Sequence, residues 1–518
     1  MGEARTAAGT SAPRVLVVTA YYKEDRALIE RTIRSVAAQT AKLSGEAIVD
    51  HMLVADGFPQ DWIDGEDVRH LRLDRAHADY GNTPRGVGSM LAISEGYDAL
   101  CYCDADNWYQ PNHVAMCLKG ARAAPDIDYV VATRTMRRPD ETVLPVTDEA
   151  MSGHVDTNCF FFLPGSYNFL HLFAAIPREM SSIGDRLFYA ALRIAKRKMA
   201  VIKSPTVNYL CLWETVYRAL GETPPPEAKP AIDGAEVDRW LATLGHRERT
   251  IVARLTGLPL SAGPAGVEGA RPTGPAKVLV ITAYDGEDRA TIERCLDAVA
   301  RQTVPVDHLL VADGRPQDWI DATGVRHVRL DRAHDDYGNT PRGFGVTLAI
   351  SEGYDALCFV GAGNWAEPNH VEACLAAAAT TAEPCDWVLA KRFHHRPDGS
   401  RIPIGVIEND VDADCLFFLR GSFHLLHHFA AQPKEIAERG DVVFHDVVLG
   451  RAGLVHAEVA EPTLHSTCWW ETIYRAAGEE PPVGARALPD PDRAAHHLAG
   501  LDPRRQRIVA RLIGLVAD

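Results

Sequence analysis

The chain has 518 residues, of which 46% are hydrophobic and 24% are charged, and its formal net charge is −16. This is the composition of an ordinary globular protein with enough apolar residues for more than one buried core. The acidic balance argues against nucleic acid as a main partner, because phosphate binding needs concentrated lysine and arginine. No apolar run approaches the roughly 20 residues of a membrane span, and no secretory signal is recognisable. With 11 scattered cysteines, we expect a reduced, cytoplasmic protein.

The sequence repeats itself at long range. Residues 15–21 return as 278–284, and residues 79–86 return as 336–343. A period this long indicates a duplicated domain and not a solenoid. A Gly/Pro/Ala-rich stretch between the copies has the composition of a linker. We therefore predict four parts: a flexible N-terminus over 1–13, a first domain over 14–258, a linker over 259–276 and a second domain over 277–518.

Strands and helices alternate along the first copy. Apolar, β-branched runs predict strands, and apolar residues at helical spacing predict helices, the second of which opens at Thr83 and Pro84. The predicted strands are 15–19, 51–55, 68–73, 99–103 and 129–132, and the predicted helices are 27–38 and 87–96. This order predicts an α/β fold with a mostly parallel sheet and helices on both faces. In such sheets ligands bind beyond the carboxyl ends of the strands, where Asp56, Asp104 and Asp106 fall.

One acidic motif distinguishes the two copies. Asp104 and Asp106 of the first copy are replaced by Gly361 and Gly363 in the second, within otherwise matching surroundings. Two carboxylates one residue apart can share a Mg²⁺ or Mn²⁺ ion, because both ions prefer oxygen ligands. The alternative is a solvated acidic loop. The selective loss favours the metal site, since a purely structural pair would more readily persist with its context.

Other candidates have a plausible structural role as well as a functional one, and the second copy keeps several of them. Asp56 could accept hydrogen bonds from a ribose or a base, or prepare the turn at Gly57. Arg85 near a helix start could bind an anion, or be a surface arginine behind a helix cap. Asp185 could be a general base, although an aspartate before a helix is more often an N-cap.

The remaining candidates are residues that could contact the acceptor or a ring of the ligand. His154 and Asp156 precede an apolar strand and could line an acceptor site. Trp213 could form a platform for a sugar ring or a base, although regularly repeated aromatics usually serve packing. In the second copy, the residues Asp410, Asp412 and Asp414 give a D-x-D in a different place and a second possible metal site, although this motif precedes its strand and does not terminate one.

Taken together, these segments resemble the inverting GT-A glycosyltransferases of family 2. The resemblance covers roughly residues 14–212 and the corresponding part of the second copy. It is carried by residues 17–21, 33–40, 53–57, 85–86 and 103–107, with Gly184 and Asp185 at the place of the family's late acidic motif. It implies two tandem Rossmann-like GT-A domains, a Mn²⁺ or Mg²⁺ cofactor and a nucleoside-diphosphate sugar as donor, with UDP-sugars first among the candidates.

The resemblance also implies roles for single residues. Thr19, Tyr21 and Asp56 correspond to nucleotide contacts. Asp104 corresponds to the ribose and metal–diphosphate contact, Asp106 to the main metal ligand, and Asp185 to the catalytic base. Two departures stand out: Gly184 replaces a second acid before the base, and residues 55–57 read Ala-Asp-Gly where the family often has paired acids.

The sequence therefore predicts a metal-dependent inverting glycosyltransferase, of the hexosyltransferase type, with its chemistry in the first copy. The second copy is expected to be a degenerate partner that completes the acceptor site, or that forms an internal pseudo-dimer in place of a second subunit; a homo-oligomer is the other arrangement. One alternative is a nucleotidyltransferase, although such enzymes often carry a Gly-rich basic loop where this chain has residues 22–26. Another is a nucleotide-sugar or glycan-binding protein without catalysis, since the second copy keeps Asp313, Arg342 and Asp441. The acceptor is not identified.

Overall fold

The computed structural model describes residues 12–146, 154–232, 234–260, 275–407, 411–488, 490 and 492–515. The chain divides into two compact units, Met1–Ala270 and Arg271–Asp518, here called unit 1 and unit 2. The flexible N-terminus and the linker that the sequence predicts fall almost wholly on residues 1–11 and 261–274, outside the described residues, as does Asp410.

Unit 1 is built on one mixed, mostly parallel sheet. Its strands are β1 Arg14–Tyr21, β2 Ile48–Ala55, β3 Arg69–Arg72, β4 Ala99–Tyr102, β5 Trp108–Tyr109, β6 Tyr129–Arg137, β7 Phe160–Phe162 and β8 Met199–Leu210. They lie in the order β3-β2-β1-β4-β7-β6-β8-β5. The first four are parallel to one another, whereas β7 is antiparallel to both of its neighbours. The carboxyl ends of β1, β2 and β4 therefore meet at one edge.

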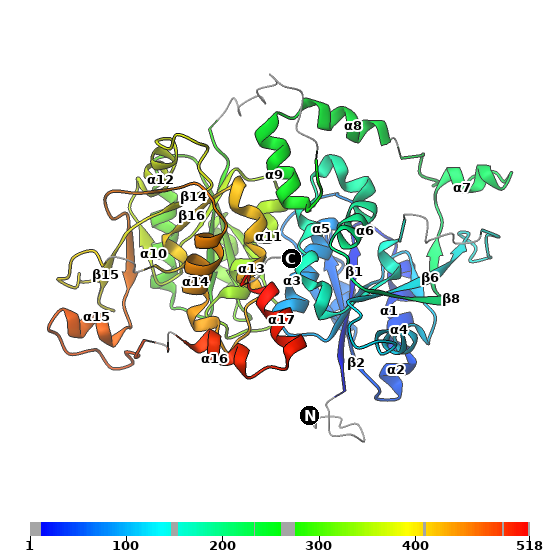
Figure 1. Cartoon of the computed structure of the whole chain (residues 1–518), viewed down its shortest axis with the longest axis horizontal. Coiled ribbons are helices and arrows are strands. Elements are labelled where there is room, and N and C mark those ends of the chain that lie inside the picture. The colour runs from blue at the N-terminus through cyan, green and yellow to red at the C-terminus, as the bar shows by residue number, and fades with distance from the viewer. Residues whose placement is uncertain are drawn as a thin grey trace. The chain divides into compact units, whose positions relative to one another are not determined.

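Helices cover both faces of this sheet (Figure 1). They are α1 Arg26–Ala37, α2 Thr40–Leu43, α3 Asn82–Ser94, α4 His113–Ala121, α5 Leu172–Ala175, α6 Gly184–Ile194, α7 Glu214–Ala219, α8 Gly234–Thr243 and α9 His246–Thr256. Helices α1, α2 and α4 lie on one face, and α3, α5 and α6 lie on the other. Every strand and helix listed in the sequence analysis is found, with ends shifted by a few residues.

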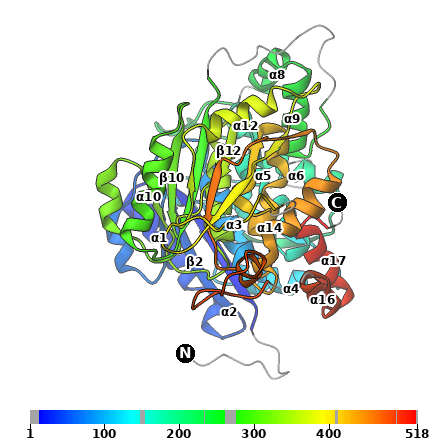
Figure 2. The ribbon, with the colours of Figure 1, turned by 90° about the vertical axis from the view of Figure 1, so that its left-hand side faces the viewer.

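Unit 2 repeats this plan. Its strands are β9 Val278–Tyr284, β10 Asp307–Ala312, β11 Arg326–Arg329, β12 Ala356–Phe359, β13 Trp365–Ala366, β14 Trp387–Leu389, β15 Arg392–His395, β16 Leu416–Leu419, β17 His456–Glu458 and β18 Leu464–Thr467. Its helices are α10 Arg289–Ala300, α11 Asn339–Ser351, α12 His370–Ala378, α13 His427–Ala430, α14 Gly440–Val443, α15 Glu471–Ala476, α16 Arg493–Ala499 and α17 Pro503–Leu512. Figure 2 shows α10 beside the sheet that contains β10 and β12.

The two units differ in how the long strands run. In unit 1, β6 pairs with β8 from end to end, with two register shifts, one on each side of Thr133. In unit 2 the equivalent strands are each broken in two, so that β13, β18 and β15 form a separate three-stranded sheet. The larger sheet keeps the order β11-β10-β9-β12-β16-β14-β17. The predicted fold class, two tandem α/β domains with mostly parallel Rossmann-like sheets, is thus confirmed.

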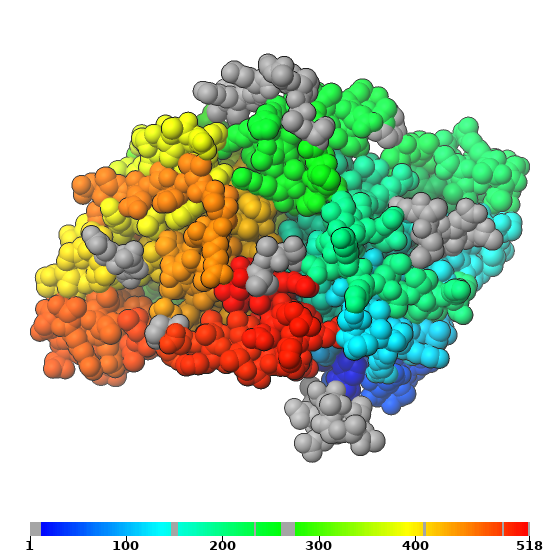
Figure 3. Space-filling model, in the orientation of Figure 1, coloured from blue at the N-terminus to red at the C-terminus, as the bar shows by residue number. Residues whose placement is uncertain are grey.

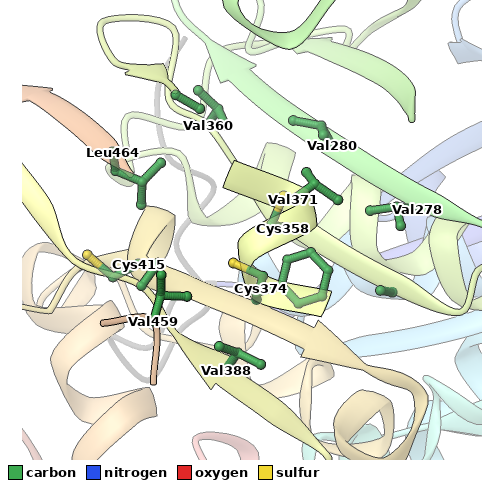
Figure 4. Packing of buried hydrophobic residues seen from close by; sticks show 14 of the residues in the cluster. Val278, Val280, Cys358, Val360, Val371, Cys374, Val388, Cys415, Val459 and Leu464 are labelled. Atoms are coloured by element: carbon green, nitrogen blue, oxygen red, sulfur yellow. The ribbon is translucent and has the colours of Figure 1, made fainter. Parts of the chain in front are cut away.

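Each sheet is buried because its strands are apolar on both faces. In unit 2, Val278 and Val280 of β9 lie beside Cys358 of β12 and against Val371 of α12 (Figure 4). All 11 cysteines are buried. The C-terminal helices α16 and α17 are instead largely exposed, and they are red in Figure 3. Among the described residues, no helix is both long enough and apolar enough to cross a bilayer.

A buried ion pair recurs in both units, so the same substitution can be tested in each. Arg69 of β3 donates to both carboxylate oxygens of Glu95, at 2.7 and 2.9 Å, and both side chains are at most 9% exposed. Arg326 and Glu352 repeat the pair at 2.6 and 2.9 Å. Because removing one partner leaves a buried charge uncompensated, we expect Glu95→Gln and Glu352→Gln each to lower the unfolding free energy of its own unit by about 3 kcal/mol.

Hydrogen exchange during chemical denaturation checks this, since it assigns each loss to the strands of one unit. Equal protection of β2 and β3 in Glu95→Gln and in the unchanged protein would contradict the expectation.

Candidate active site

A cavity of about 790 Å³ lies in unit 1 at the carboxyl ends of the strands. It is lined from the end of β1, the loops after β2 and β4, the start of α3, the start of α6 and the segment after β8. Nearly all of the site residues predicted from the sequence line it, namely Tyr21, Asp56, Arg85, Asp104, Asp106, His154, Asp156, Asp185 and Trp213. The topology thus gathers in one place residues that are up to 192 positions apart in the chain, from Tyr21 to Trp213.

Thr19 is the exception. Its side chain is fully buried, and its hydroxyl donates to the Cys103 carbonyl at 2.6 Å and lies 2.8 Å from His51 Nε2. The residue does not line the cavity. We therefore correct the predicted donor contact of Thr19: its hydroxyl ties β1 to the end of β4, and it is not available to a ligand.

Tyr21 lines the cavity, but its side chain is buried and hydrogen-bonded. Its ring is 2% exposed, and its hydroxyl lies 2.6 Å from His70 Nε2 and accepts from the Gln60 backbone N–H at 3.1 Å. Burial is the main reason that the pKa of Tyr21 is raised to about 12. The phenol is therefore a fixed structural group, and any contact of this residue with a nucleotide would come from its main chain.

Asp56 organises the loop that follows β3. One carboxylate oxygen accepts from the His77 backbone N–H at 2.9 Å and pairs with His77 Nδ1 at 2.8 Å; the other accepts from the Ala78 N–H at 2.9 Å. Gly57 has a φ of 77°, and a Cβ there would lie 2.3 Å from the Ala76 nitrogen. Both residues are thus needed by the turn, and a donor contact of Asp56 stays a prediction.

The D-x-D loop is held by helix α1 and by strand β8. From α1, Thr32 donates to the Asn107 carbonyl at 2.6 Å and Arg31 donates to the Asp106 carbonyl at 2.6 Å. From β8, the Leu210 N–H donates to the Asn107 side chain at 2.8 Å. These bonds fix the backbone of the loop, and with it the points from which its two aspartate side chains leave the chain.

Those two carboxylates have different surroundings. Asp104 Oδ1 pairs with the buried guanidinium of Arg85, and Asp104 Oδ2 accepts from Asn158 Nδ2 at 2.8 Å. Asp106 has no such partner for its carboxylate among the described residues. Burial, and then the charge of Asp104, raise the pKa of Asp106 to about 7, while Lys229 opposes the rise.

This difference decides which residue fits a metal. Asp106 presents an uncommitted carboxylate to the cavity, and a hard divalent cation would relieve its unfavourable ionisation. The Asp104 carboxylate is already bonded to Arg85 and Asn158, so it could bind an ion only through the oxygen lone pairs that these two bonds leave free. The residues present therefore fit Mn²⁺ or Mg²⁺ on Asp106, with Asp104 as a secondary ligand.

A second polar group lies across the cavity. Ligand atoms of His154, Asp156 and Asp185 all lie within 4.8 Å of one another. His154 Nδ1 is 3.3 Å from Asp185 Oδ2, and Asp156 Oδ2 pairs with Arg134 at 2.7 Å. Burial raises the pKa of Asp185, the neighbouring His154 opposes the rise, and Asp156 adds to it. This end of the cavity can take up a proton, and its imidazole and two carboxylates could also hold a cation.

Helix α6 supplies Asp185 from its first turn. The helix begins at Gly184, with Ile183 as its N-cap, so Asp185 is not the cap; its Oδ1 accepts from the Arg186 N–H at 2.7 Å. A Cβ at residue 184 would lie 3.1 Å from Asn82 Nδ2 and 3.4 Å from Ile176 Cδ1. The close approach of α6 to the start of α3 thus explains why glycine stands where the resemblance leads one to expect a second acid.

Several cavity residues were missed by the sequence reasoning. Arg134 pairs with Asp156 and lies 4.6 Å from the Tyr209 ring, whose hydroxyl accepts from Trp213 Nε1 at 2.9 Å. Lys229 lies with its ammonium 5.9 Å from the Trp213 ring. Arg134 and Lys229 have basic counterparts in unit 2, Arg392 and Arg486, and this repetition was the signal available in the sequence.

Fold and site together define an α/β unit with an acidic, partly aromatic cavity at the carboxyl ends of its parallel strands. No protein-family model matches the chain, and no curated protein matches it. Among solved structures, part of the chain is similar to S. aureus TarS, with 12% identity and a TM-score of 0.30, over 44% of this chain and 42% of TarS. The chain thus spans less than half the length of that protein.

Two shorter forms of the same protein are similar to the chain as well. TarS 1–349 in complex with UDP-GlcNAc has 12% identity and a TM-score of 0.30, over 47% of this chain and 65% of that one. TarS 1–349 in complex with UDP has 14% identity and a TM-score of 0.30, over 48% and 76%.

Proposed function

We propose that the protein is a metal-dependent inverting glycosyltransferase of the hexosyltransferase type, whose chemistry takes place in unit 1. The donor is a nucleoside-diphosphate sugar, with UDP-sugars as the first class to test. The observation that carries the proposal is that Asp106 and Asp185 open into one cavity at the strand ends. A cation-binding carboxylate and a base on a shared cavity are what transfer from a diphosphate leaving group to a hydroxyl requires.

Each residue has a role in this reaction. Asp106, supported by Asp104, would hold Mn²⁺ or Mg²⁺, which when bound neutralises the charge that develops on the leaving diphosphate. Asp185 removes the proton from the acceptor hydroxyl while the acceptor oxygen bonds to the anomeric carbon. The bond from that carbon to the diphosphate oxygen breaks, and the diphosphate keeps the electron pair. His154 orients the Asp185 carboxylate, and Trp213 with Tyr209 offers an aromatic face to a sugar.

We propose that unit 2 does not catalyse transfer. It has Gly361 and Gly363 where unit 1 has the two carboxylates, so it lacks the D-x-D pair at the end of its fourth strand, β12. It keeps Asp313, which pairs with His334 Nδ1 at 2.5 Å as Asp56 pairs with His77. The retained framework supports a scaffold or acceptor-binding role.

Ligand-dependent stability tests the proposal. We expect Mn²⁺ together with at least one UDP-sugar to stabilise unit 1 by about 3 kcal/mol when the ligand is at 100 times its Kd. A chelator should abolish the effect, and an added acceptor should release nucleoside diphosphate. Release of pyrophosphate would instead identify a nucleotidyltransferase, and stabilisation without turnover over a broad acceptor panel would identify a binding protein.

A further inference from the structure

Asn158 lies behind the D-x-D loop and is fully buried. Its side-chain oxygen, Oδ1, accepts from the Asp104 backbone N–H at 2.6 Å. Its amide nitrogen donates to Asp104 Oδ2 at 2.8 Å and to Asp156 Oδ1 at 2.8 Å. One side chain thus joins the carboxylate at the end of β4 to the carboxylate that lies beside Asp185 and His154.

Unit 2 has the carboxylate at the position equivalent to Asn158, and none at the position equivalent to Asp104. Gly361 stands at the place of Asp104, and Asp414 stands at the place of Asn158. Asp414 is 5% exposed, and its Oδ2 accepts from the Gly361 N–H at 2.8 Å and from the Asn364 amide at 2.7 Å. Its other oxygen, Oδ1, is buried without a hydrogen-bond partner among the described residues.

The two arrangements exclude each other. A Cβ on Gly361 would lie 3.3 Å from Asp414 Oδ2, so a carboxylate on residue 361 would stand close to the Asp414 carboxylate. Two carboxylates at these positions would also place like charges together in a buried site, which is strongly unfavourable. An ionised aspartate at 158 has no proton to donate, so it cannot replace the amide that binds Asp104 and Asp156.

We propose that Asn158 is a positioning residue of the unit 1 site: its neutral amide holds the Asp104 carboxylate at the strand end and ties it to the Asp156 side of the cavity. The positions of Asp104 and Asn158 form a pair that carries one carboxylate. In unit 1 the carboxylate is on Asp104, which lines the cavity, and in unit 2 it is on Asp414, the equivalent of Asn158. The positioning role rests on the proposed function of the unit 1 cavity, whereas the pairing does not.

A double-mutant cycle on the full chain, without ligands, tests the pairing. The variants are Asn158→Asp, Asp104→Gly and the two combined, which copies unit 2. We expect each single change to raise the unfolding equilibrium constant of unit 1 about 100-fold. The double variant should be at least about tenfold more stable than the product of the single effects, because Asp at 158 can then accept as Asp414 does. Independent, multiplicative effects would overturn the pairing.

Binding and kinetics test the positioning role. Asn158→Ala is expected to weaken Mn²⁺ and UDP binding by the folded protein about 10- to 100-fold, as loss of a residue that orients a ligating group does. It should also raise the donor KM more than it lowers kcat. Asp414→Ala is the matched control in unit 2 and should leave these constants unchanged.

The outcomes separate the two proposals. Wild-type binding constants in a destabilised Asn158→Ala protein would show a structural residue only and overturn the positioning role. If the unchanged protein binds neither Mn²⁺ nor UDP, the proposed function fails and the positioning role fails with it, while the unfolding cycle alone decides the pairing.

Discussion

Replacing Asp185 by asparagine is expected to lower kcat about 10³-fold, since a positioned base contributes on the order of 10² to 10⁴ to proton transfer. The amide oxygen of Asn can still accept from the Arg186 N–H, so the start of α6 should be preserved. A base must be ionised to act, and burial raises the pKa of Asp185. Activity of the unchanged enzyme should therefore fall as the pH drops through that raised pKa, above the 3.8 of an ordinary aspartate. The residual activity of Asp185→Asn should lack this acidic limb.

Unit 2 offers the matched control. Asp441 occupies the equivalent place in α14, and burial raises its pKa in the same direction. Asp441→Asn should therefore change the stability of the start of α14 about as much as Asp185→Asn changes that of α6. It should leave kcat unchanged. Loss of turnover in Asp441→Asn with full turnover in Asp185→Asn would move the chemistry to unit 2. The pH–rate profile and circular dichroism of both variants complete the measurement.

The fold and the position of the site follow from the sequence because of one property of parallel sheets. Asp56 and Asp104 each come directly after a buried strand, and parallel strands end at the same edge, so their convergence was predictable. The loss of the D-x-D pair at Gly361 and Gly363 was equally visible. The sequence pattern places Asp185 before a helix, where an aspartate is more often an N-cap, whereas α6 begins one residue earlier, at Gly184.

Side-chain direction and long-range partners were not predictable in the same way. Thr19 is on the same strand as Tyr21, but its hydroxyl satisfies the Cys103 carbonyl, which only the pairing of β1 with β4 reveals. Asn158 comes from a short 3₁₀ turn before β7, an inserted antiparallel strand whose position next to β4 no local pattern specifies. The exchange of carboxylate and amide between Asp104–Asn158 and Gly361–Asp414 is a relation between distant positions, and it becomes meaningful only when their contact is known.

The second large effect concerns Asp106, whose replacement by asparagine is expected to stabilise the metal-free protein above pH 7. The pKa of Asp106 is raised from 3.8 to about 7 in the folded chain, mainly by burial. Well below pH 3.8 the carboxyl is protonated in both folded and unfolded states, and the substitution should have little effect. As the pH rises from 4 to 7 the unfolded chain releases this proton first, so the unchanged protein loses stability. The loss reaches at most about 4 kcal/mol, since a tenfold change in proton affinity is worth about 1.4 kcal/mol.

The opposite sign is expected from Asp104→Asn, because Asp104 is already paired. Removing its charge leaves the buried guanidinium of Arg85 uncompensated, which should cost about 3 kcal/mol at pH 8. Urea unfolding at pH 4 and pH 8, with and without Mn²⁺, measures the unfolding free energy of both variants.

With saturating Mn²⁺, the unchanged protein should become more stable than Asp106→Asn, since only the unchanged protein gains the free energy of cation binding. Stabilisation of Asp106→Asn by Mn²⁺ to the same degree as the unchanged protein would place the cation elsewhere, with the cluster of His154, Asp156 and Asp185 as the next position to test.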